Sequence, residues 1–343
     1  MARLDEEPEI IRLSEALGLA GTPAPVNSIL EYCTRRVDGW VREVRGVANI
    51  SELEQLVATR LGVTIEEIWD DSDLEALVKK YVSIGEIAFA LIRADFDGET
   101  FGATYRRKYA SPDSPDRYVA FIDCRGDKAS RRFFTRWHEL AHIITLPSEL
   151  DAPVRRSTRD PTERLMDEIA GHLGFYKPLF TPALGSVVTR CGRLGFDAID
   201  EVRRNWFAEA SFQSTVFACL RSTHSPVIYI EAAPAHKAAN ERAMRGGVQW
   251  LFDELKPQAQ LRAVQVISND AAIREELFIP PNIRIPPVSV IHRLFVDPGI
   301  RSLIAEENLY HWEHSGGSRL GAYAVTVEAR CFGERVLALV QPT

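Results

Sequence analysis

The sequence predicts an α+β protein, and three observations lead to this class. Apolar residues recur at helical spacing near the N-terminus and again between residues 130 and 178. Two short segments rich in aromatic and β-branched residues, 101–107 and 118–123, predict strands directly before the second helical region. After residue 225 the chain alternates predicted strands with a helix. The chain therefore combines mainly helical regions with short strands, which is typical of an α+β protein.

The length of the chain predicts more than one domain, because 343 residues exceed one ordinary core. Changes of pattern along the chain divide it into four expected parts. These are a helical N-terminal region 1–90, a core 91–183, a helical segment 184–224, and an α+β domain 225–343.

Composition limits the class of protein. Apolar residues make up 45% of the chain and charged residues 26%, which is typical of a globular protein. A net charge of −7 provides no overall attraction to nucleic acid or to a membrane. The N-terminus has no apolar signal segment, and no apolar run approaches the about 18 residues that a membrane span needs. Five scattered cysteines without C-x-x-C spacing indicate reduced thiols. We therefore expect a cytoplasmic protein with no membrane partner.

The N-terminal region is expected to be helical and carries no residues that point to chemistry. Residues 10–17 and 51–62 have helical patterns on either side of a Gly/Pro-rich break. Ser51 and Glu54 have the spacing of a capping box, and Gly62 is placed to end the second helix.

The predicted strands 101–107 and 118–123 form a hairpin around a loop rich in Ser, Pro and Asp. Two interpretations of this hairpin remain open. It is either a plain structural element or an edge that binds an extended peptide by adding it to the sheet. Tyr105, Tyr109 and Tyr176 are candidates to donate to an oxyanion, although packing is the commoner role for such tyrosines.

Residues 130–146 contain an H-E-x-x-H motif inside a predicted helix. Apolar side chains recur along one face of that helix, Ser130 is placed as its N-cap, and Pro147 follows its end. On a helix, His138 and His142 share one face, so both imidazoles can bind one metal ion, with Glu139 beside them. The plainer alternative is a core helix whose two histidines are satisfied by hydrogen bonds.

The motif predicts zinc chemistry. A zinc ion held by three protein ligands lowers the pKa of water to about 7 and needs a nearby carboxylate to take the proton. His138 and His142 are the expected ligands, and Glu139 is the expected general base. The longer metzincin motif is excluded, since Thr145 and Ser148 replace its glycine and third histidine.

A second predicted helix supplies the third ligand. It starts at Pro161 and ends before Pro178, and Glu163 and Asp167 lie on one of its faces. Glu163 can complete a His/His/Glu zinc site, while Asp167 can accept a hydrogen bond from a ligand histidine and so set its tautomer. The rival third ligands are Glu149, Asp151 and Asp160, which stand on less regular backbone.

Two segments resemble the ImmA/IrrE-type metallopeptidases. Residues 134–142, Phe-Thr-Arg-Trp-His-Glu-Leu-Ala-His, resemble the family's F-T-x-A-H-E-x-x-H. Glu163 to Ala170 is similar to its E-x-x-A-(N/D)-x-F-A helix, with Asp167 at the N/D position. The chain departs from the pattern at Trp137, where the family has a small residue, and at Met166, where it has Ala. These motifs cover about residues 100–180.

The resemblance implies a fold and a function. It implies a zincin-like peptidase domain, mostly helical with a small sheet, in which zinc is bound by His138, His142 and Glu163. It implies a regulatory endopeptidase whose substrate is a protein partner, such as a DNA-binding repressor. For the IrrE-like subgroup it further implies a helix-turn-helix-like segment at 184–224 and a GAF-like, sensory C-terminal domain at 225–343.

The helical segment is not expected to bind nucleic acid directly. Residues 197–207 and 211–221 predict two helices, and the second has a single basic residue, Arg221, at its end. A recognition helix normally presents several Arg, Lys, Asn or Gln side chains to DNA. A role in packing or substrate docking is the alternative.

The C-terminal part is expected to be a small α+β domain. Strands are predicted at 227–230 and 263–268, a helix at 242–255, and a final hairpin over 322–340. His311 and His314 are expected in a surface loop and not at a second metal site.

Two functions from other classes stay open. One is a ligand-sensing transcriptional regulator with a structural metal, and the other is an inactive interaction module. The sequence predicts neither the peptide bond that is cut nor the oligomeric state.

Overall fold

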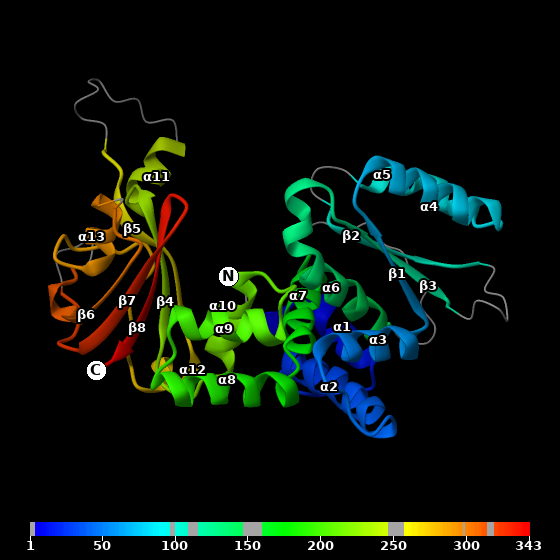
Figure 1. Cartoon of the computed structure of the whole chain (residues 1–343), viewed down its shortest axis with the longest axis horizontal. Helices are drawn as coiled ribbons and strands as arrows, with labels where there is room; N and C mark the ends of the chain where they lie inside the picture. The colour runs from blue at the N-terminus through cyan, green and yellow to red at the C-terminus, as the bar shows by residue number, and fades with distance from the viewer. Residues whose placement is uncertain are drawn as a thin grey trace. The chain divides into compact units, whose positions relative to one another are not determined.

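The computed structural model describes residues 4–96, 100–108, 116–146, 160–245, 257–297, 299–313 and 319–343. It confirms the α+β class, with helices and two separate sheets in these ranges (Figure 1). The chain divides into two compact units. Unit 1 contains residues 1–187 and 201–218, and unit 2 contains residues 188–200 and 219–343. Along the chain, residues of the two units therefore alternate within the segment 184–224.

Unit 1 begins with helices, after a short 3₁₀ turn at Leu4–Glu6. The helices are α1 (Pro8–Ala16), α2 (Pro25–Glu43) and α3 (Ile50–Leu61). The predicted capping box at Ser51 and Glu54 is wrong, because Asn49 caps α3 by accepting from the backbone N–H of Glu52. The side chain of Glu52 in turn accepts a hydrogen bond from the backbone N–H of Ala48. Gly62 ends α3 with a left-handed φ of 65°, as predicted.

A strand follows α3 inside the region expected to be helical. This strand, β1 (Val63–Ile68), pairs in parallel with β3 (Tyr118–Asp123), and β2 (Gly102–Arg106) pairs with β3 in antiparallel fashion. The predicted hairpin is thus confirmed, but it belongs to a three-stranded sheet in the order β1-β3-β2. The six residues of β1 show no clear alternation of apolar and polar side chains, so the sequence did not predict this strand. It forms because β3 supplies its pairing partner.

The two faces of this sheet are covered by different helices. On one face, α4 (Asp71–Ser83), the 3₁₀ turn Ile87–Leu91 and α5 (Ile92–Asp95) pack against the sheet. Tyr81, Phe89, Tyr105 and Phe121 form an aromatic cluster in that layer. The other face carries α6 (Arg132–Ile144), which contacts β2 and β3. Alternate residues of β2 therefore point toward α6.

The helix α6 packs against α7 (Pro161–Gly174). As predicted, Pro161 opens α7, after Asp160 as N-cap. The prediction that Ser130 caps α6 is wrong, because a 3₁₀ turn, Gly126–Arg131, leads directly into the helix. Trp137, which is fully buried, packs against Gly174, where a Cβ would lie 2.9 Å from its ring. A residue without a side chain therefore makes room for the large ring.

Three helices follow α7, in the part of the chain where residues of the two units alternate. They are α8 (Lys177–Cys191), α9 (Phe196–Trp206) and α10 (Phe212–Ser222). The last two confirm the helices predicted at 197–207 and 211–221. None of the helices in the described ranges is both long enough and apolar enough to cross a membrane.

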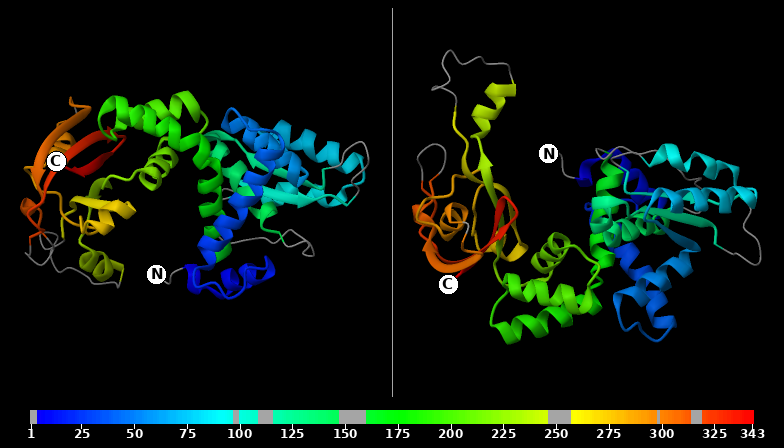
Figure 2. Two further views of the ribbon diagram at one scale, coloured as in Figure 1. Left: turned by 90° about the horizontal axis from the view of Figure 1, so that it is seen from below. Right: turned by 45° about the horizontal axis from the view of Figure 1, so that its top comes forward.

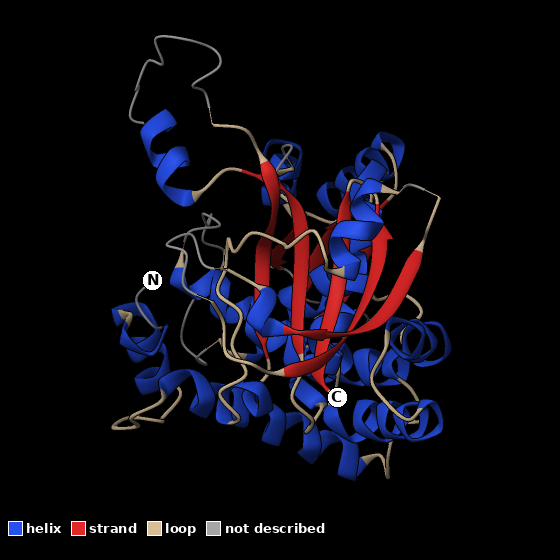
Figure 3. Ribbon diagram, turned by 90° about the vertical axis from the view of Figure 1, so that its left-hand side faces the viewer, coloured by secondary structure: helices blue, strands red, loops and turns tan. Residues whose placement is uncertain are grey.

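Unit 2 is built on an antiparallel sheet in the order β5-β4-β8-β7-β6 (Figures 2 and 3). Its strands are β4 (Ile228–Ala235), β5 (Gln260–Ser268), β6 (Ser302–Asn308), β7 (Ala324–Phe332) and β8 (Arg335–Pro342). The predicted strands and the final hairpin are confirmed, and β6 was not predicted.

Short helices accompany this sheet. They are α11 (Ala238–Arg245), α12 (Asp270–Arg274) and α13 (Val290–Val296), and α13 packs against β6, β7 and β8. The helix predicted at 242–255 overlaps α11, and its remainder lies outside the described residues. His311 ends a 3₁₀ turn, Leu309–His311, and His314 lies outside the described residues.

Candidate metal centre

The helix α6 carries the H-E-x-x-H motif on a frame of buried apolar side chains. Phe133, Trp137, Leu140, Ala141 and Ile144 are each at most 3% exposed, which confirms the apolar stripe. Burial of this stripe fixes the rotation of the helix, so His138 and His142 are both directed to the neighbouring helix α7.

A buried arginine on α6 ties the helix to three other segments. Arg136 is paired with Glu54 of α3 at 2.9 Å, with Glu67 of β1 at 2.7 Å, and with Glu209 between α9 and α10. Burial raises the pKa of Glu54, whereas the bond to Arg136 outweighs burial at Glu209 and holds its pKa low. This network fastens the motif helix at a position next to His138.

The C-terminal end of α6 is held by α2. Arg36 donates from its guanidinium to the backbone carbonyl of Ile144 at 2.8 Å. The last carbonyls of a helix have no partner within it, so a cation there satisfies an acceptor and complements the helix dipole. Arg36 also lies over the rings of Tyr32 and Trp40. Both ends of the motif are therefore held by residues far away in the sequence.

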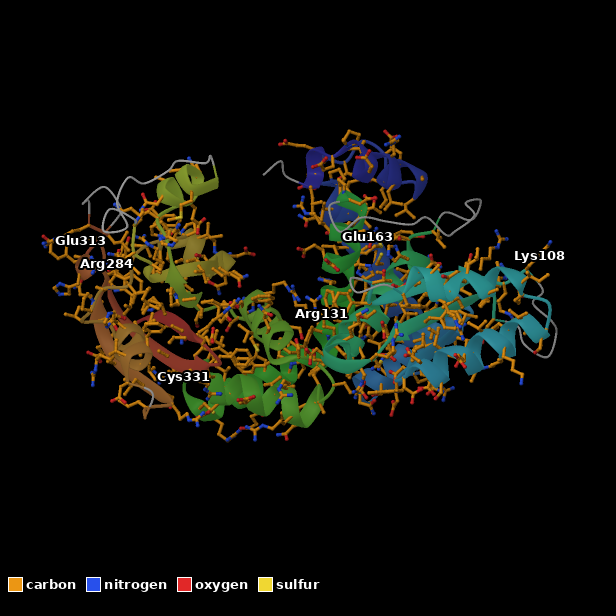
Figure 4. All side chains as sticks on the ribbon, turned by 90° about the horizontal axis from the view of Figure 1, so that it is seen from above. Lys108, Arg131, Glu163, Arg284, Glu313 and Cys331 are labelled. Carbon is orange, nitrogen blue, oxygen red and sulfur yellow. The ribbon has the colours of Figure 1, made fainter. Side chains whose placement is uncertain are left out.

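His138, His142 and Glu163 meet between α6 and α7. Within the described residues, their donor atoms form a group in which all lie within 4.8 Å of one another. Nε2 of His138 lies 3.0 Å from Oε2 of Glu163 and 3.1 Å from Nε2 of His142. Nε2 of His142 lies 3.6 Å from Oε1 of Glu163. In Figure 4, Glu163 is labelled on α7, and Arg131 marks the chain just before α6.

These separations can be compared with the needs of a zinc ion. Zinc binds imidazole nitrogen and carboxylate oxygen at about 2.0–2.1 Å in a tetrahedron, whose edges are then about 3.3 Å. The observed 3.0, 3.1 and 3.6 Å lie around that value. Two imidazole Nε2 atoms at 3.1 Å repel unless a proton or another cation lies between them, and a bound metal ion would supply that charge. The donor set therefore fits a zinc ion.

Asp167 completes the surroundings of His138. Its Oδ1 lies 2.8 Å from Nδ1 of His138, on the ring edge away from Glu163. Burial alone would lower the pKa of His138, but the bonds to Asp167 and Glu163 outweigh it and raise the pKa to about 10. Burial would also raise the pKa of Glu163, and its bonds to the two histidines instead hold it far below the usual value. These shifts describe a site that favours positive charge.

Glu139 stands apart from the three donors. It is 5% exposed, and its Oε2 accepts a hydrogen bond at 2.6 Å from the hydroxyl of Thr104 on β2. The predicted base is therefore held against the sheet and is not one of the clustered donor atoms.

The rival residues have other places. Asp160 accepts a hydrogen bond from the backbone N–H of Thr162 as the N-cap of α7, while Glu149 and Asp151 lie outside the described residues.

The tyrosines considered as oxyanion donors have other partners. Tyr176 donates a hydrogen bond to Asp38 at 2.5 Å, and Tyr105 donates one to Asp95. These two hydroxyls are thus engaged away from the cluster. Tyr109 lies outside the described residues.

The residues that hold the site in place could not be predicted from the sequence. Arg136 lies within the motif segment, but its three carboxylate partners are 69 to 82 residues away. Arg36 and Thr104 lie on elements with no motif of their own. The G-x-T pattern at the start of β2 becomes meaningful only once β2 is known to lie beside α6.

The comparisons with known proteins give no match for this chain, either among protein-family models or among curated proteins.

Proposed function

We propose that this chain is a zinc-dependent endopeptidase in which His138, His142 and Glu163 bind the metal. The observation that carries the proposal is the convergence of three donor atoms from two helices within 4.8 Å. Their types, two imidazoles and one carboxylate, are those of a catalytic zinc site, which leaves one position open.

The residues around the metal have separate tasks. A zinc ion in such a site acts as a Lewis acid and lowers the pKa of water to about 7. Glu139 takes a proton from water as the water attacks the peptide carbonyl, and it then delivers a proton to the leaving amine. Asp167 accepts a hydrogen bond from the Nδ1–H group of His138, which leaves Nε2 of that ring free to bind the metal.

The substrate that we propose is a protein partner, such as a DNA-binding repressor, which is cut for regulation. The resemblance of residues 134–142 and 163–170 to the ImmA/IrrE-type motifs supports this class of substrate. It also supports a zincin-like fold for the core 91–183, a GAF-like fold for 225–343, and action in the cytoplasm. The position of β2 at the edge of the described sheet is compatible with an extended peptide substrate.

The test uses the full-length chain with purified candidate repressors, before and after removal of metal by a chelator. We expect cleavage only with metal present. Glu139→Gln should keep the metal and still capture the partner, while cleavage falls by about 10²- to 10⁴-fold, as is typical of a lost general base. Cleavage by Glu139→Gln at the wild-type rate would rule out the proposal. Specific DNA binding that survives chelation would favour a transcriptional regulator.

A further inference from the structure

We infer that Gly102 and Thr104 of β2 position the carboxylate of Glu139, and so act as positioning residues for the proposed base. The inference rests on the proposed function, because positioning matters only if Glu139 takes a proton. It assigns a role to a strand that lies outside the H-E-x-x-H motif and before it in the chain.

The two residues share one face of β2. Positions 102 and 104 are two apart in a strand, so both point to the same side of the sheet. That side is the one covered by α6, whereas Tyr105, between Thr104 and Arg106, belongs to the aromatic core on the opposite side. Glu139 therefore meets a short row made of Gly102 and Thr104.

Thr104 provides the attractive contact. Its hydroxyl lies 2.6 Å from Oε2 of Glu139, and the carboxylate can only accept in this pair. A hydrogen bond to an ionised carboxylate is shorter and stronger than one between neutral groups. Oε1 accepts no hydrogen bond from any residue in the described ranges. Thr104 thus holds one carboxylate oxygen and leaves the other for the proton.

Gly102 provides the space. A Cβ at this position would lie 2.7 Å from Oε1 of Glu139, 3.1 Å from its Cδ, and 2.7 Å from Cγ2 of Thr135. Thr135 is itself held on α6 by a hydrogen bond from its hydroxyl to the carbonyl of Arg131. Any side chain at position 102 would therefore push the carboxylate away from its place. Because Glu139 is 5% exposed, it has little room to move without disturbing its neighbours.

A plainer role for the Thr104 bond is to fasten β2 to α6. Both roles predict that its loss lowers stability, so stability does not separate them. A double-mutant cycle on the affinity of a zinc-binding ligand does separate them. If Thr104 acts by positioning Glu139, its effect on this affinity should vanish once the carboxylate is gone.

The experiment compares Thr104→Val, Thr104→Ser and Glu139→Gln, alone and combined, in the full-length zinc-loaded chain. The first readout is the affinity for acetohydroxamate, a small zinc-binding acid whose proton a neighbouring carboxylate accepts. We expect Thr104→Val to weaken this affinity by about 10- to 100-fold, as is typical when a partner that orients a site residue is removed. Thr104→Ser should restore it, and zinc content should not change.

The second readout is the crystal structure of each variant, with and without zinc. The carboxylate of Glu139 should leave β2 in Thr104→Val and keep its place in Thr104→Ser. Gly102→Ala should displace it as well. Gly185→Ala is the matched control, because a Cβ there meets nothing within 4 Å. It should leave both readouts unchanged.

Two results would overturn the inference. One is a Glu139 carboxylate that keeps its place in Thr104→Val. The other is an equal loss of hydroxamate affinity from Thr104→Val in the wild-type and Glu139→Gln backgrounds. A wild-type chain that binds no zinc would instead refute the proposed function, and the zinc-free crystal structures would then decide the positioning by themselves.

Discussion

Oδ1 of Asp167 lies 2.8 Å from Nδ1 of His138, which joins α7 to the motif helix α6 on the far side of the donor cluster. Glu163, one helical turn earlier on α7, meets the other nitrogen of the same ring at 3.0 Å. One imidazole is therefore held at both nitrogens by two carboxylates from one helix. The ring therefore presents Nδ1 to Asp167 and Nε2 to Glu163 and His142.

Asp167→Asn is expected to weaken zinc binding by about 10- to 100-fold, because a neutral amide holds the Nδ1 proton less strongly. Competition with a chromophoric chelator measures the affinity. Glu168→Gln, at an exposed neighbouring position of α7, is the matched control and should bind zinc as the wild type does. Equal affinities for Asp167→Asn and wild type would show that Asp167 does not orient His138.

Glu163→Ala is expected to abolish zinc binding near stoichiometric concentrations, because it removes one of the three proposed ligands. Asp160→Ala, three residues earlier, should retain zinc and lose about 1 kcal/mol of stability with the N-cap of α7. Metal analysis of the purified chains measures the first effect, and urea denaturation measures the second. If zinc binding survives Glu163→Ala but is lost in Glu149→Ala or Asp151→Ala, the third ligand is that residue and not Glu163.

Arg136→Met is expected to destabilise unit 1, because it leaves Glu54, Glu67 and Glu209 without their shared cation. Breaking a fully buried pair costs about 3–5 kcal/mol, and we expect about 2 kcal/mol here since the carboxylates are partly exposed. Arg132→Met, whose pair with Glu209 is longer at 3.6 Å, should cost less than about 1 kcal/mol. Urea denaturation of zinc-free protein measures both values. Equal effects of the two variants would contradict a special role for Arg136.

Asp123 predicts a specific acid sensitivity of unit 1. It is 1% exposed at the end of β3 and pairs with Arg125 and Lys128 at 2.9 and 2.8 Å. Burial alone would raise its pKa, but the hydrogen bonds from these two cations outweigh burial and hold the pKa below its ordinary value. A carboxyl group with a lowered pKa in the folded state stabilises the fold above its unfolded pKa, and this contribution is lost as the pH falls through the folded pKa.

Asp123→Asn should therefore be less stable than the wild type at pH 6, and the difference should shrink as the pH falls below about 4. Denaturation of the zinc-free proteins across this range measures it. Asp71→Asn is the control, because Asp71 contacts the same Arg125 from an exposed position with its side chain 86% accessible. A difference for Asp123→Asn that does not change with pH would contradict the lowered pKa.

The sequence by itself determined the elements whose signals are local. The apolar stripe from Phe133 to Ile144 defined α6, and Pro161 defined the start of α7. Helical periodicity places His138 and His142 on one face, so the pairing of two donors needed no tertiary information. The hairpin of β2 and β3 and the final hairpin of unit 2 were also predictable, because alternating apolar residues and turns are features of neighbouring residues.

Only the tertiary structure decided which distant residues meet these elements. β1 pairs with β3 across about fifty residues, and Arg136 meets acids from α3, β1 and the α9–α10 connection. Thr104 reaches Glu139 because the pleat of β2 turns alternate side chains toward α6. Such contacts depend on how elements pack, and packing is selected by the burial of the whole core, which no short segment encodes. The candidate donors His138, His142 and Glu163 are therefore visible in the local pattern, while the residues that orient them come from the fold.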